Sequence, residues 1–194
     1  NNVIIEASSH GLDQKRLHHV NFKSAIFTNF SQDHLDYHKS MNSYLNAKLI
    51  LFKSVLSKGS VIISDKAIQP FKKLKLIAKK RSLRLLDINN EIEKIKKMRL
   101  NSVSDFKIKN LAMSIKACRL LGLKDKKIFN TIRKLKAVSG RLELIKTYPN
   151  NIKVYIDYAH TPDALLKTLN FLKSEYGNNI SLIFGCGGDR DKKK

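Results

Sequence analysis

Short apolar runs alternate along the chain with longer amphipathic stretches. This pattern predicts an α/β protein with a mostly parallel sheet flanked by helices. Strands are predicted at residues 2–7, 23–29, 60–64, 83–88, 152–157 and 180–185. The clearest helix is predicted from about Ser43 to Ser57, because apolar side chains recur there at helical spacing. Those side chains are Leu45, Leu49, Phe52 and Leu56. Further helices are predicted over residues 66–81, 91–99, 107–121 and 125–136.

Two signals in the last third of the chain predict another helix and a domain boundary. Thr161 suits an N-cap and Pro162 suits the first helical position, so a helix is predicted to begin there. Its inward-facing stripe is predicted to comprise Leu165, Leu169, Leu172 and Tyr176. Near residues 138–141 a pair of helices gives way to a new unit that begins with strands. We therefore predict one domain over residues 1–139 and the beginning of a second over residues 140–194.

The two ends of the chain lead us to expect a piece of a longer protein. The sequence has no initiator Met and starts inside the predicted strand at residues 2–7. It stops at Lys194, before any helix follows the predicted strand at residues 180–185. On this interpretation the second domain is incomplete.

The composition narrows the class of protein. With 194 residues, 42% hydrophobic and 28% charged, the chain is typical of a globular protein and not of a collagen-like or disordered one. No apolar run approaches the ~20 residues of a membrane span, and no signal peptide is visible, so membrane insertion is not expected. The two cysteines, Cys118 and Cys186, lie far apart without metal-binding spacing, which indicates a reducing, cytoplasmic setting.

The net charge of +22 suggests nucleic-acid binding as an alternative class of function. Lysine supplies most of this charge, whereas arginine, which suits bidentate contacts to phosphate and guanine, is scarce. Aromatic residues are not interleaved with basic ones as in single-strand-binding proteins. The most basic stretch, residues 66–100, lies away from the motifs below, so a solvated helical face explains it more simply. We therefore expect no nucleic-acid partner and treat this class as the rival interpretation.

Polar residues gather just after four of the predicted strands, where open α/β sheets place their ligand sites. These segments are Glu6–Gly11, Thr28–His38, Asp157–Asp163 and Gly185–Arg190. Glu6 could cap the helix that follows it or hold a hard cation such as Mg²⁺. His34 and His38 are spaced to hold zinc on a helix, but the glutamate of the zinc-protease pattern is missing. Lys48 lies at the edge of the apolar stripe, where a snorkelling lysine is the simplest interpretation.

In their order and spacing, six motifs of the chain resemble those of the Mur ligase family. The motifs are EASSHGLDQKR, IFTNFSQDHLDYH, LNAKLILF, VSGRLE, DYAHTPDAL and FGCGGDRDKKK. The resemblance covers almost the whole chain except about residues 61–103. It implies the latter part of a central ATP-binding domain, followed by the start of a Rossmann-like C-terminal domain.

The same resemblance implies an ATP-dependent ligase that forms an amide bond through an acyl phosphate. Within the family, the motifs are most similar to the members that add the third amino acid to UDP-N-acetylmuramoyl-L-alanyl-D-glutamate in peptidoglycan synthesis. A folylpolyglutamate-synthetase-like ligase is the alternative, because such enzymes share the architecture of the Mur ligases and, like them, carry a carbamylated lysine.

The resemblance also implies roles for individual residues. Lys48 matches the family's carbamylated lysine, and a carbamate would turn this cation into an anion that helps to position Mg²⁺. The residues implied to surround the metal are Glu6, His34 and Lys48. Those implied to contact the UDP-linked peptide are Ser8, Gln14 and Arg16. Those implied to bind ATP are Asn110, Arg141, Asp157 and His160. The residues implied to act in catalysis are Lys48, His34 and Arg141.

The chain departs from the family pattern in several places. Lys107 stands where the family has the first Asn of its adenine-side FNxxN motif, and the segment 61–103 is shorter than usual. The family's Gly-rich phosphate loop and its amino-acid-selecting motif are not in this chain, so the 194 residues alone are expected to be inactive. The expected partners are UDP-MurNAc-dipeptide, ATP and either meso-diaminopimelate or lysine, bound by a monomer.

Overall fold

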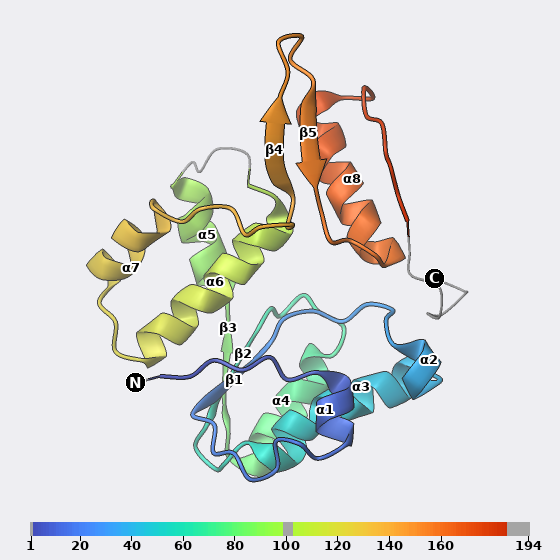
Figure 1. Ribbon diagram of the computed structural model, residues 1–194. Helices are drawn as coiled ribbons and strands as arrows, with labels where there is room; N and C mark the ends of the chain where they lie inside the picture. Colours follow the sequence, from blue (N-terminus) through green and yellow to red (C-terminus); the bar gives the residue numbers. More distant parts are fainter. Residues whose placement is uncertain (1, 99–102, 186–194) are drawn as a thin grey trace. The chain divides into compact units, whose positions relative to one another are not determined.

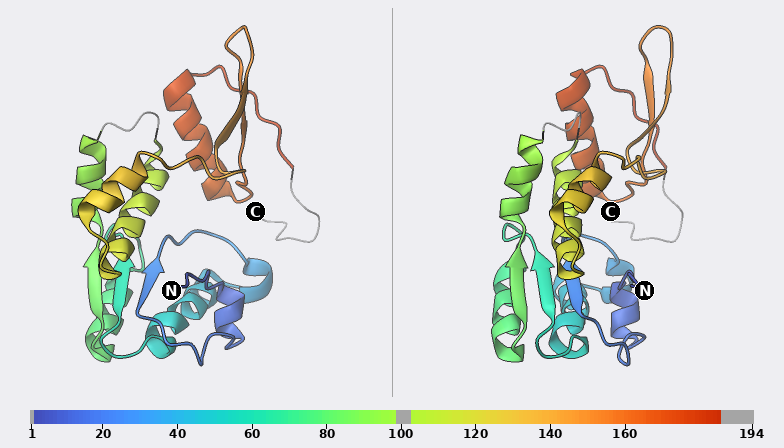
Figure 2. Two further views of the ribbon diagram at one scale, coloured as in Figure 1. Left: turned by 60° about the vertical axis from the view of Figure 1, so that its left-hand side comes forward. Right: turned by 90° about the vertical axis from the view of Figure 1, so that its left-hand side faces the viewer.

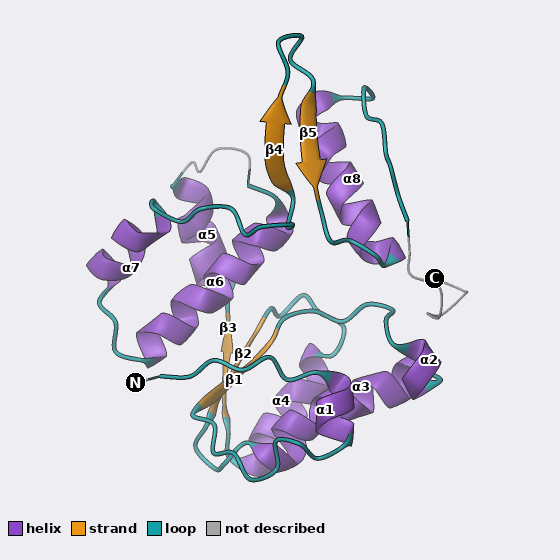
Figure 3. Ribbon diagram, in the orientation of Figure 1, coloured by secondary structure: helices purple, strands orange, loops and turns teal. Residues whose placement is uncertain are grey.

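The computed structural model describes residues 2–98 and 103–185 (Figure 1). Contacts divide the chain into two compact units. The first takes in the described residues of Asn1–Phe30 and His34–Leu123, and the second those of Ser31–Asp33 and Lys124–Lys194. Strands and helices alternate in the first unit, whereas the second contains a β-hairpin (Figure 3).

The first unit is built on a parallel sheet of short strands. In sheet order these are β1 (Ser24–Phe27), β2 (Val61–Ser64) and β3 (Arg84–Asp87). Ile62 of β2 lies level with Ala25 on one side and Leu85 on the other. Every residue of β2 is buried, as expected of a central parallel strand that is covered on both faces. The structure thus confirms the α/β fold class and the strands predicted at residues 23–29, 60–64 and 83–88.

Two groups of helices surround this sheet. The first group consists of α1 (Ser9–Asp13), α3 (Met41–Ile50), the π-helix η1 (Leu51–Val55) and α4 (Phe71–Arg81). It packs on the face of the sheet that carries Ala25, Phe27 and Ile62. The second group consists of α5 (Asn89–Lys97) and α6 (Asp105–Leu120), and α6 contacts β2. Figures 1 and 2 show α5 and α6 apart from α1, α3 and α4. The short helix α2 (Leu35–His38) contacts α3.

The helix predicted over residues 43–57 is in fact two consecutive elements, α3 and η1. The Leu56 amide donates to the Leu51 carbonyl at 2.9 Å, which closes a widened turn of the π type. This turn keeps Phe52 and Leu56 on the core side, at 1% and 0% exposure. The Arg81 guanidinium donates to the Leu56 carbonyl at 2.9 Å and so satisfies the end of the helix.

Two of the predicted strands are wrong. Residues 2–7 form no strand, and Val3 and Ile4 are 81% and 93% exposed. Residues 180–185 form none either, and Ile183 is 100% exposed. An apolar run becomes a strand only where a neighbouring strand satisfies its backbone groups, and none does so for these segments among the described residues. The polar segment predicted after residue 185 lies outside the described residues.

The second unit consists of α7 (Asp125–Ile132), a hairpin of β4 (Glu143–Thr147) and β5 (Lys153–Ile156), and α8 (Pro162–Tyr176). The strand predicted at residues 152–157 is confirmed as β5, and β4 pairs with it in antiparallel orientation. Helix α8 begins as predicted, because the Thr161 hydroxyl accepts a hydrogen bond from the Ala164 amide at 3.3 Å.

The predicted inward stripe of α8 is only half-buried, and Thr168 is the buried side chain of this helix. The Tyr155 and Tyr176 hydroxyls lie 2.6 Å apart and join β5 to the end of α8. Burial, followed by the hydrogen bond to Tyr176, raises the pKa of Tyr155 to about 12.

Two leucines of α4 provide a matched test of this core. Leu74 is fully buried in the core, at 0% exposure, whereas Leu76 is 62% exposed. We expect Leu74→Ala to lower the free energy of unfolding of this unit by about 2–5 kcal/mol, through lost burial and a residual cavity. Leu76→Ala should change it by less than about 0.5 kcal/mol. Urea denaturation of the full-length variants measures both values, and equal losses would contradict the packing described here.

The Tyr155–Tyr176 contact predicts a dependence of stability on alkaline pH. The folded pKa of Tyr155 lies above the value of about 10 for an unfolded chain. Its contribution to stability is therefore complete below pH ~10 and is lost as the pH rises towards 12. Absorbance titration should detect one tyrosine that ionises near pH 12. Tyr155→Phe should abolish this ionisation near pH 12. Tyr148→Phe, which changes an exposed residue of the hairpin, should leave it intact.

Candidate functional site

Imidazole and phenol rings form a cluster where α1, α2 and α3 come together. The histidine–tyrosine cluster consists of His10, His34, Tyr37, His38 and Tyr44. The His10 ring is at its centre, 4.2 Å from the Tyr37 ring and 4.9 Å from the His34 ring between centroids. Tyr44 joins the cluster from α3, with its ring 5.4 Å from His38 and 6.0 Å from His34.

Local interactions hold the two short helices that carry these rings. The Ser8 hydroxyl caps α1 by accepting a hydrogen bond from the Gly11 amide at 3.1 Å. A Cβ at residue 11 would lie 3.1 Å from the Ser8 Oγ, so this close approach favours glycine. The Tyr37 hydroxyl donates to Asp13 Oδ2 at 2.9 Å and ties α2 to α1. These hydrogen bonds therefore hold α1 and α2, and the rings that they carry, in place.

His38 is the buried member of the cluster, and its Nε2 lies 2.9 Å from the Ser9 hydroxyl. Burial, reinforced by the neighbouring His10, lowers the pKa of His38 below its ordinary value. The contact with Ser9 gives this neutral, buried imidazole a structural role. The described residues contain no group of three histidine, cysteine or acidic side chains able to hold a metal ion.

The structure brings two of the predicted metal-side residues to the same tyrosine. Lys48, half-buried on α3, places its Nζ 4.9 Å from the centroid of the Tyr44 ring, which the His34 ring also contacts. Glu6 lies in the exposed segment that precedes the cap of α1.

The predicted contacts to the UDP-linked peptide lie at the two ends of α1. Ser8 caps the beginning of the helix, whereas Gln14 and Arg16 follow its end and are exposed. The Arg16 amide donates to the Gly11 carbonyl at 2.9 Å, and Lys15 has a left-handed backbone at φ 58°. This turn holds Gln14 and Arg16 in a defined, solvent-facing loop next to the histidine–tyrosine cluster.

The second unit gathers three of the four predicted ATP-side residues. Asp157 accepts hydrogen bonds from the Leu142 amide at 2.6 Å, the Ala159 amide at 2.8 Å and the Thr168 hydroxyl at 3.3 Å. The carboxylate thus joins the start of β4, the end of β5 and α8, and it holds the chain around Arg141.

Tyr158 is a residue of this second group that the sequence interpretation missed. The Arg141 guanidinium lies 4.6 Å from the centroid of the Tyr158 ring, in cation–π geometry. His160 Nδ1 donates to the Tyr158 carbonyl at 2.9 Å, and the two rings are 5.0 Å apart. The position of Tyr158 inside the DYAHTPDAL motif was the signal that could have revealed it.

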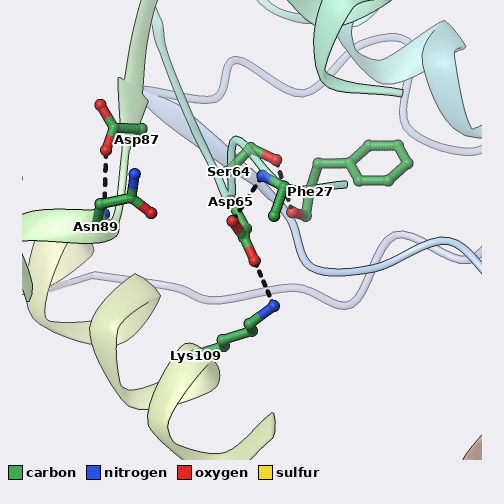
Figure 4. A network of polar contacts seen from close by, with 7 residues as sticks. Phe27, Ser64, Asp65, Asp87, Asn89 and Lys109 are labelled. Atoms are coloured by element: carbon green, nitrogen blue, oxygen red, sulfur yellow. Dashed lines mark hydrogen bonds and ion pairs between the residues drawn. The ribbon is translucent and has the colours of Figure 1, made fainter. Parts of the chain in front are cut away.

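Asn110, the fourth predicted ATP-side residue, belongs to the first unit. It is exposed on α6, and its carbonyl accepts a hydrogen bond from the Ser114 hydroxyl at 2.9 Å. The sequence interpretation also missed a buried carboxylate close to Asn110 in the fold. Asp65, which follows β2, forms an ion pair at 2.7 Å with Lys109, the residue before Asn110 on α6 (Figure 4). A pocket of about 190 Å³ borders this ion pair and is also lined by Asn89, Lys96 and Asp105.

Basic residues gather elsewhere on the surface. A shallow pocket of about 400 Å³ on α7 is lined by Lys124, Lys126, Lys127 and Lys134, together with Asn130 and Thr131. None of these residues belongs to the groups around Tyr44 or Tyr158, so this basic pocket does not overlap with the candidate site residues. In the part of the chain that the structure describes, no helix has the length and apolar character that crossing a membrane requires.

Comparison with known proteins identifies two family domains in the order that the motifs predict. The model of the Mur ligase middle domain matches residues 1–122, and that of the Mur ligase, glutamate ligase domain matches residues 140–194. A relative from Rickettsia bellii (strain RML369-C), named UDP-N-acetylmuramoyl-L-alanyl-D-glutamate--2,6-diaminopimelate ligase, is 39% identical over 99% of this chain and 44% of its own length. A relative of the same name from Wigglesworthia glossinidia brevipalpis is 38% identical over 100% of this chain and 44% of its own length.

Solved structures agree with these matches. A structure of a UDP-N-acetylmuramoyl-L-alanyl-D-glutamate--2,6-diaminopimelate ligase superposes with a TM-score of 0.65 at 26% identity, over 95% of this chain and 42% of that chain. MurF from Acinetobacter baumannii superposes with a TM-score of 0.63 at 13% identity, over 77% of this chain and 37% of that chain, a likeness of fold alone. The chain spans less than half the length of the relatives and structures it matches.

Proposed function

The chain belongs to the Mur ligase family, and on this premise we propose that the protein carrying it joins diaminopimelate to UDP-N-acetylmuramoyl-L-alanyl-D-glutamate at the expense of ATP. The observation that carries this proposal is the match, over essentially the whole chain, to relatives named for that reaction. Both family domains lie in the expected order, and each contains a preorganised group of polar side chains.

The reaction requires activation, because a carboxylate does not acylate an amine at neutral pH. In the proposed sequence, an oxygen of the substrate carboxylate attacks the γ-phosphorus of ATP, and ADP departs. The amine of the incoming amino acid then attacks the acyl phosphate, and the tetrahedral intermediate expels phosphate and loses a proton. Positioning and charge neutralisation are the main catalytic contributions to such a transfer.

On the substrate side, we assign the contacts to the UDP-linked dipeptide to Ser8, Gln14 and Arg16. The support is their placement around α1, with the two longer side chains exposed on one defined loop. A guanidinium such as that of Arg16 can bind a carboxylate or phosphate through two parallel hydrogen bonds.

On the metal side, we assign Mg²⁺ to Glu6, His34 and a carbamate formed on Lys48. An ammonium at Lys48 would repel a cation near His34, whereas a carbamate would offer oxygen ligands beside the same Tyr44 ring. The small number of protein ligands fits Mg²⁺, which retains waters and binds substrate phosphates. When bound, the ion would neutralise the charge that develops on the transferring phosphoryl group.

On the ATP side, we assign binding roles to Asn110, Arg141, Asp157 and His160. Arg141 is held against the Tyr158 ring, where its remaining hydrogen-bond donors can spread negative charge on phosphate oxygens. Asp157 contributes by ordering this loop, because its carboxylate already accepts three hydrogen bonds from the protein.

Three further assignments accompany this function. We place the domain boundary at residues 139 and 140, supported by the second family match, which begins at residue 140. We expect the protein to act in the cytoplasm, where its free thiol, Cys118, would remain reduced. We expect a monomer. Incubation of the full-length protein with UDP-MurNAc-dipeptide and ATP tests the activity: amide formation with diaminopimelate is expected, and its absence with both diaminopimelate and lysine would overturn the proposal.

Lys48 provides a sharp test of the metal side. We expect Lys48→Ala to abolish amide formation in the full-length enzyme, and added short-chain carboxylic acids to restore part of it by filling the vacated anionic position. Lys48→Arg should remain inactive, because arginine keeps the positive charge but cannot form the carbamate. Initial rates with and without formate or acetate measure these effects, and mass spectrometry in bicarbonate detects the carbamate.

The pH dependence of this modification has a definite sign. Carbamylation consumes the neutral amine and CO₂ and releases a proton, so the site should load better at mildly alkaline pH. Near-normal activity of Lys48→Arg would show that Lys48 is an ordinary surface lysine, and the assignment of a carbamate would then fail.

Arg16 tests the substrate side. We expect Arg16→Ala to raise the KM for the UDP-linked dipeptide about 10-fold or more while changing kcat little, because it removes a contact made equally in the ground and transition states. Steady-state kinetics at saturating ATP measure both constants, with Lys15→Ala in the same exposed turn as the matched control. A collapsed kcat at an unchanged KM would instead place Arg16 in the chemical step.

A further inference from the structure

Asp65 is a carboxylate that the proposed reaction does not use, yet it is almost completely buried, at 1% exposure. It follows the central strand β2 directly, and its Oδ1 accepts a hydrogen bond from the Ala67 amide at 2.8 Å. Its Oδ2 lies 2.7 Å from the Lys109 ammonium, which comes from α6 (Figure 4). Burial by itself would raise the pKa of Asp65, but the hydrogen bonds from Lys109 and Ala67 outweigh it and hold the pKa below its usual range. The carboxylate is therefore charged at neutral pH.

The first two turns of α6 are only partly buried. The N-cap residue, Ser104, makes no side-chain capping hydrogen bond. Residues 105–110 are all exposed or half-buried, and the buried apolar side chains of this helix begin only at Ala112. The Asp65–Lys109 ion pair connects the residue that follows β2 to the beginning of α6. Lys109 is itself the neighbour of Asn110 in the sequence.

We propose that Asp65 is a positioning residue for nucleotide binding: through Lys109 it holds the first turns of α6, and with them Asn110, at the carboxyl end of β2. The proposal rests on the ATP role assigned to Asn110 under the proposed function. Asp65 itself need not touch ATP. Its contribution is to fix where the Asn110 side chain lies before the nucleotide binds. The buried carboxylate that follows β2 pairs with the partly exposed Lys109 side chain and so restrains the beginning of α6.

A second buried carboxylate that pairs with α6 provides a matched control. Glu91 of α5, at 3% exposure, pairs with Lys116 at 3.0 Å and also binds Arg119, near the other end of the helix. Both acidic residues anchor α6 from a buried position, but of the two it is Asp65 that anchors the turn that carries Asn110. Loss of either pair weakens the attachment of the helix, whereas only loss of the Asp65 pair should disturb nucleotide binding.

Hydrogen exchange of the full-length protein without ligands tests the anchoring directly. Asp65→Asn keeps the size of the side chain and removes its charge. We expect it to speed exchange of the Lys109–Leu111 amides about 10-fold, because the first turns then open more often. Glu91→Gln should speed exchange near residues 116–120 and leave Lys109–Leu111 unchanged. Unchanged exchange at Lys109–Leu111 in Asp65→Asn would overturn the proposal, whatever the enzymatic activity.

Kinetics of the full-length enzyme test the consequence for ATP. We expect Asp65→Asn to raise the KM for ATP about 10-fold, with kcat and the KM for the UDP-linked dipeptide within about twofold, because small displacements of a binding group are costly. Lys109→Arg, which keeps the ion pair, should retain the KM for ATP of the natural enzyme. Asp65→Asn combined with Lys109→Met should be no worse than Asp65→Asn alone, because both changes remove the same interaction.

The outcomes separate this proposal from a general loss of stability and from failure of the proposed function. An equal rise in the KM for ATP in Glu91→Gln would show that any loosening of α6 suffices, and it would overturn a specific role for Asp65. An unchanged KM for ATP in Asp65→Asn would overturn the role as well. If the natural protein forms no amide with ATP, the proposed function fails, and ATP affinity measured by calorimetry on the same variants then decides the inference.

Discussion

The burial of β2 on both faces is the constraint on which the first unit depends. Because both faces of β2 are covered, none of its side chains faces solvent, and polar side chains can reach solvent or distant partners only at the end of the strand. Ser64, at 0% exposure, donates to the Phe27 carbonyl at 3.1 Å and joins β2 to β1. Asp65 is the next residue, and there the chain turns out of the sheet towards α4. The candidate chemistry of this unit lies in loops and helices that this sheet supports.

The same type of turn ends three of the five strands that the structure describes. The amide two residues after an aspartate donates to its Oδ1 at Asp65, Asp87 and Asp157, at 2.8, 3.0 and 2.8 Å. Such turns let the chain leave a strand sharply while the carboxylate stays fixed by the backbone. At Asp65 and Asp157 the carboxylate also binds a group distant in sequence, Lys109 in one case and Leu142 in the other. Strand ends of this kind are rigid supports on which functional side chains can be placed.

The histidine–tyrosine cluster brings three imidazoles together in a chain whose net charge is +22. Burial lowers the pKa of His38, so this buried imidazole is neutral at pH 7 and adds no positive charge to the cluster. Tyr44 presents its ring to Lys48 and to His34, and these contacts help to order both side chains. This arrangement leaves the Lys48 amine next to aromatic surface, and the chemistry proposed for this lysine needs its neutral form.

Local sequence signals were enough to predict much of the secondary structure of this protein and its family. The apolar periodicity predicted β1, β2, β3 and β5 and the longer helices, but not the short helices α1 and α2. The cap at Thr161 marked the start of α8, and the motifs indicated the Mur ligase family. Helix periodicity and capping depend on residues within a few positions of one another, so a single sequence reveals them. The ring cluster was also partly visible, because three of its members lie within the segment His34–His38.

Tertiary structure alone decided the features that depend on distant partners. Residues 2–7 look like a strand, but a strand exists only if another one pairs with it, and the sequence cannot supply that condition. The widened turn of η1 follows from packing Phe52 and Leu56 into one core. The Asp65–Lys109 pair joins residues 44 positions apart, from 65 to 109, and appears in the sequence as two ordinary charges. Only the fold buries the Asp65 carboxylate and brings the partly exposed Lys109 ammonium to it, which makes the pair an attachment between β2 and α6.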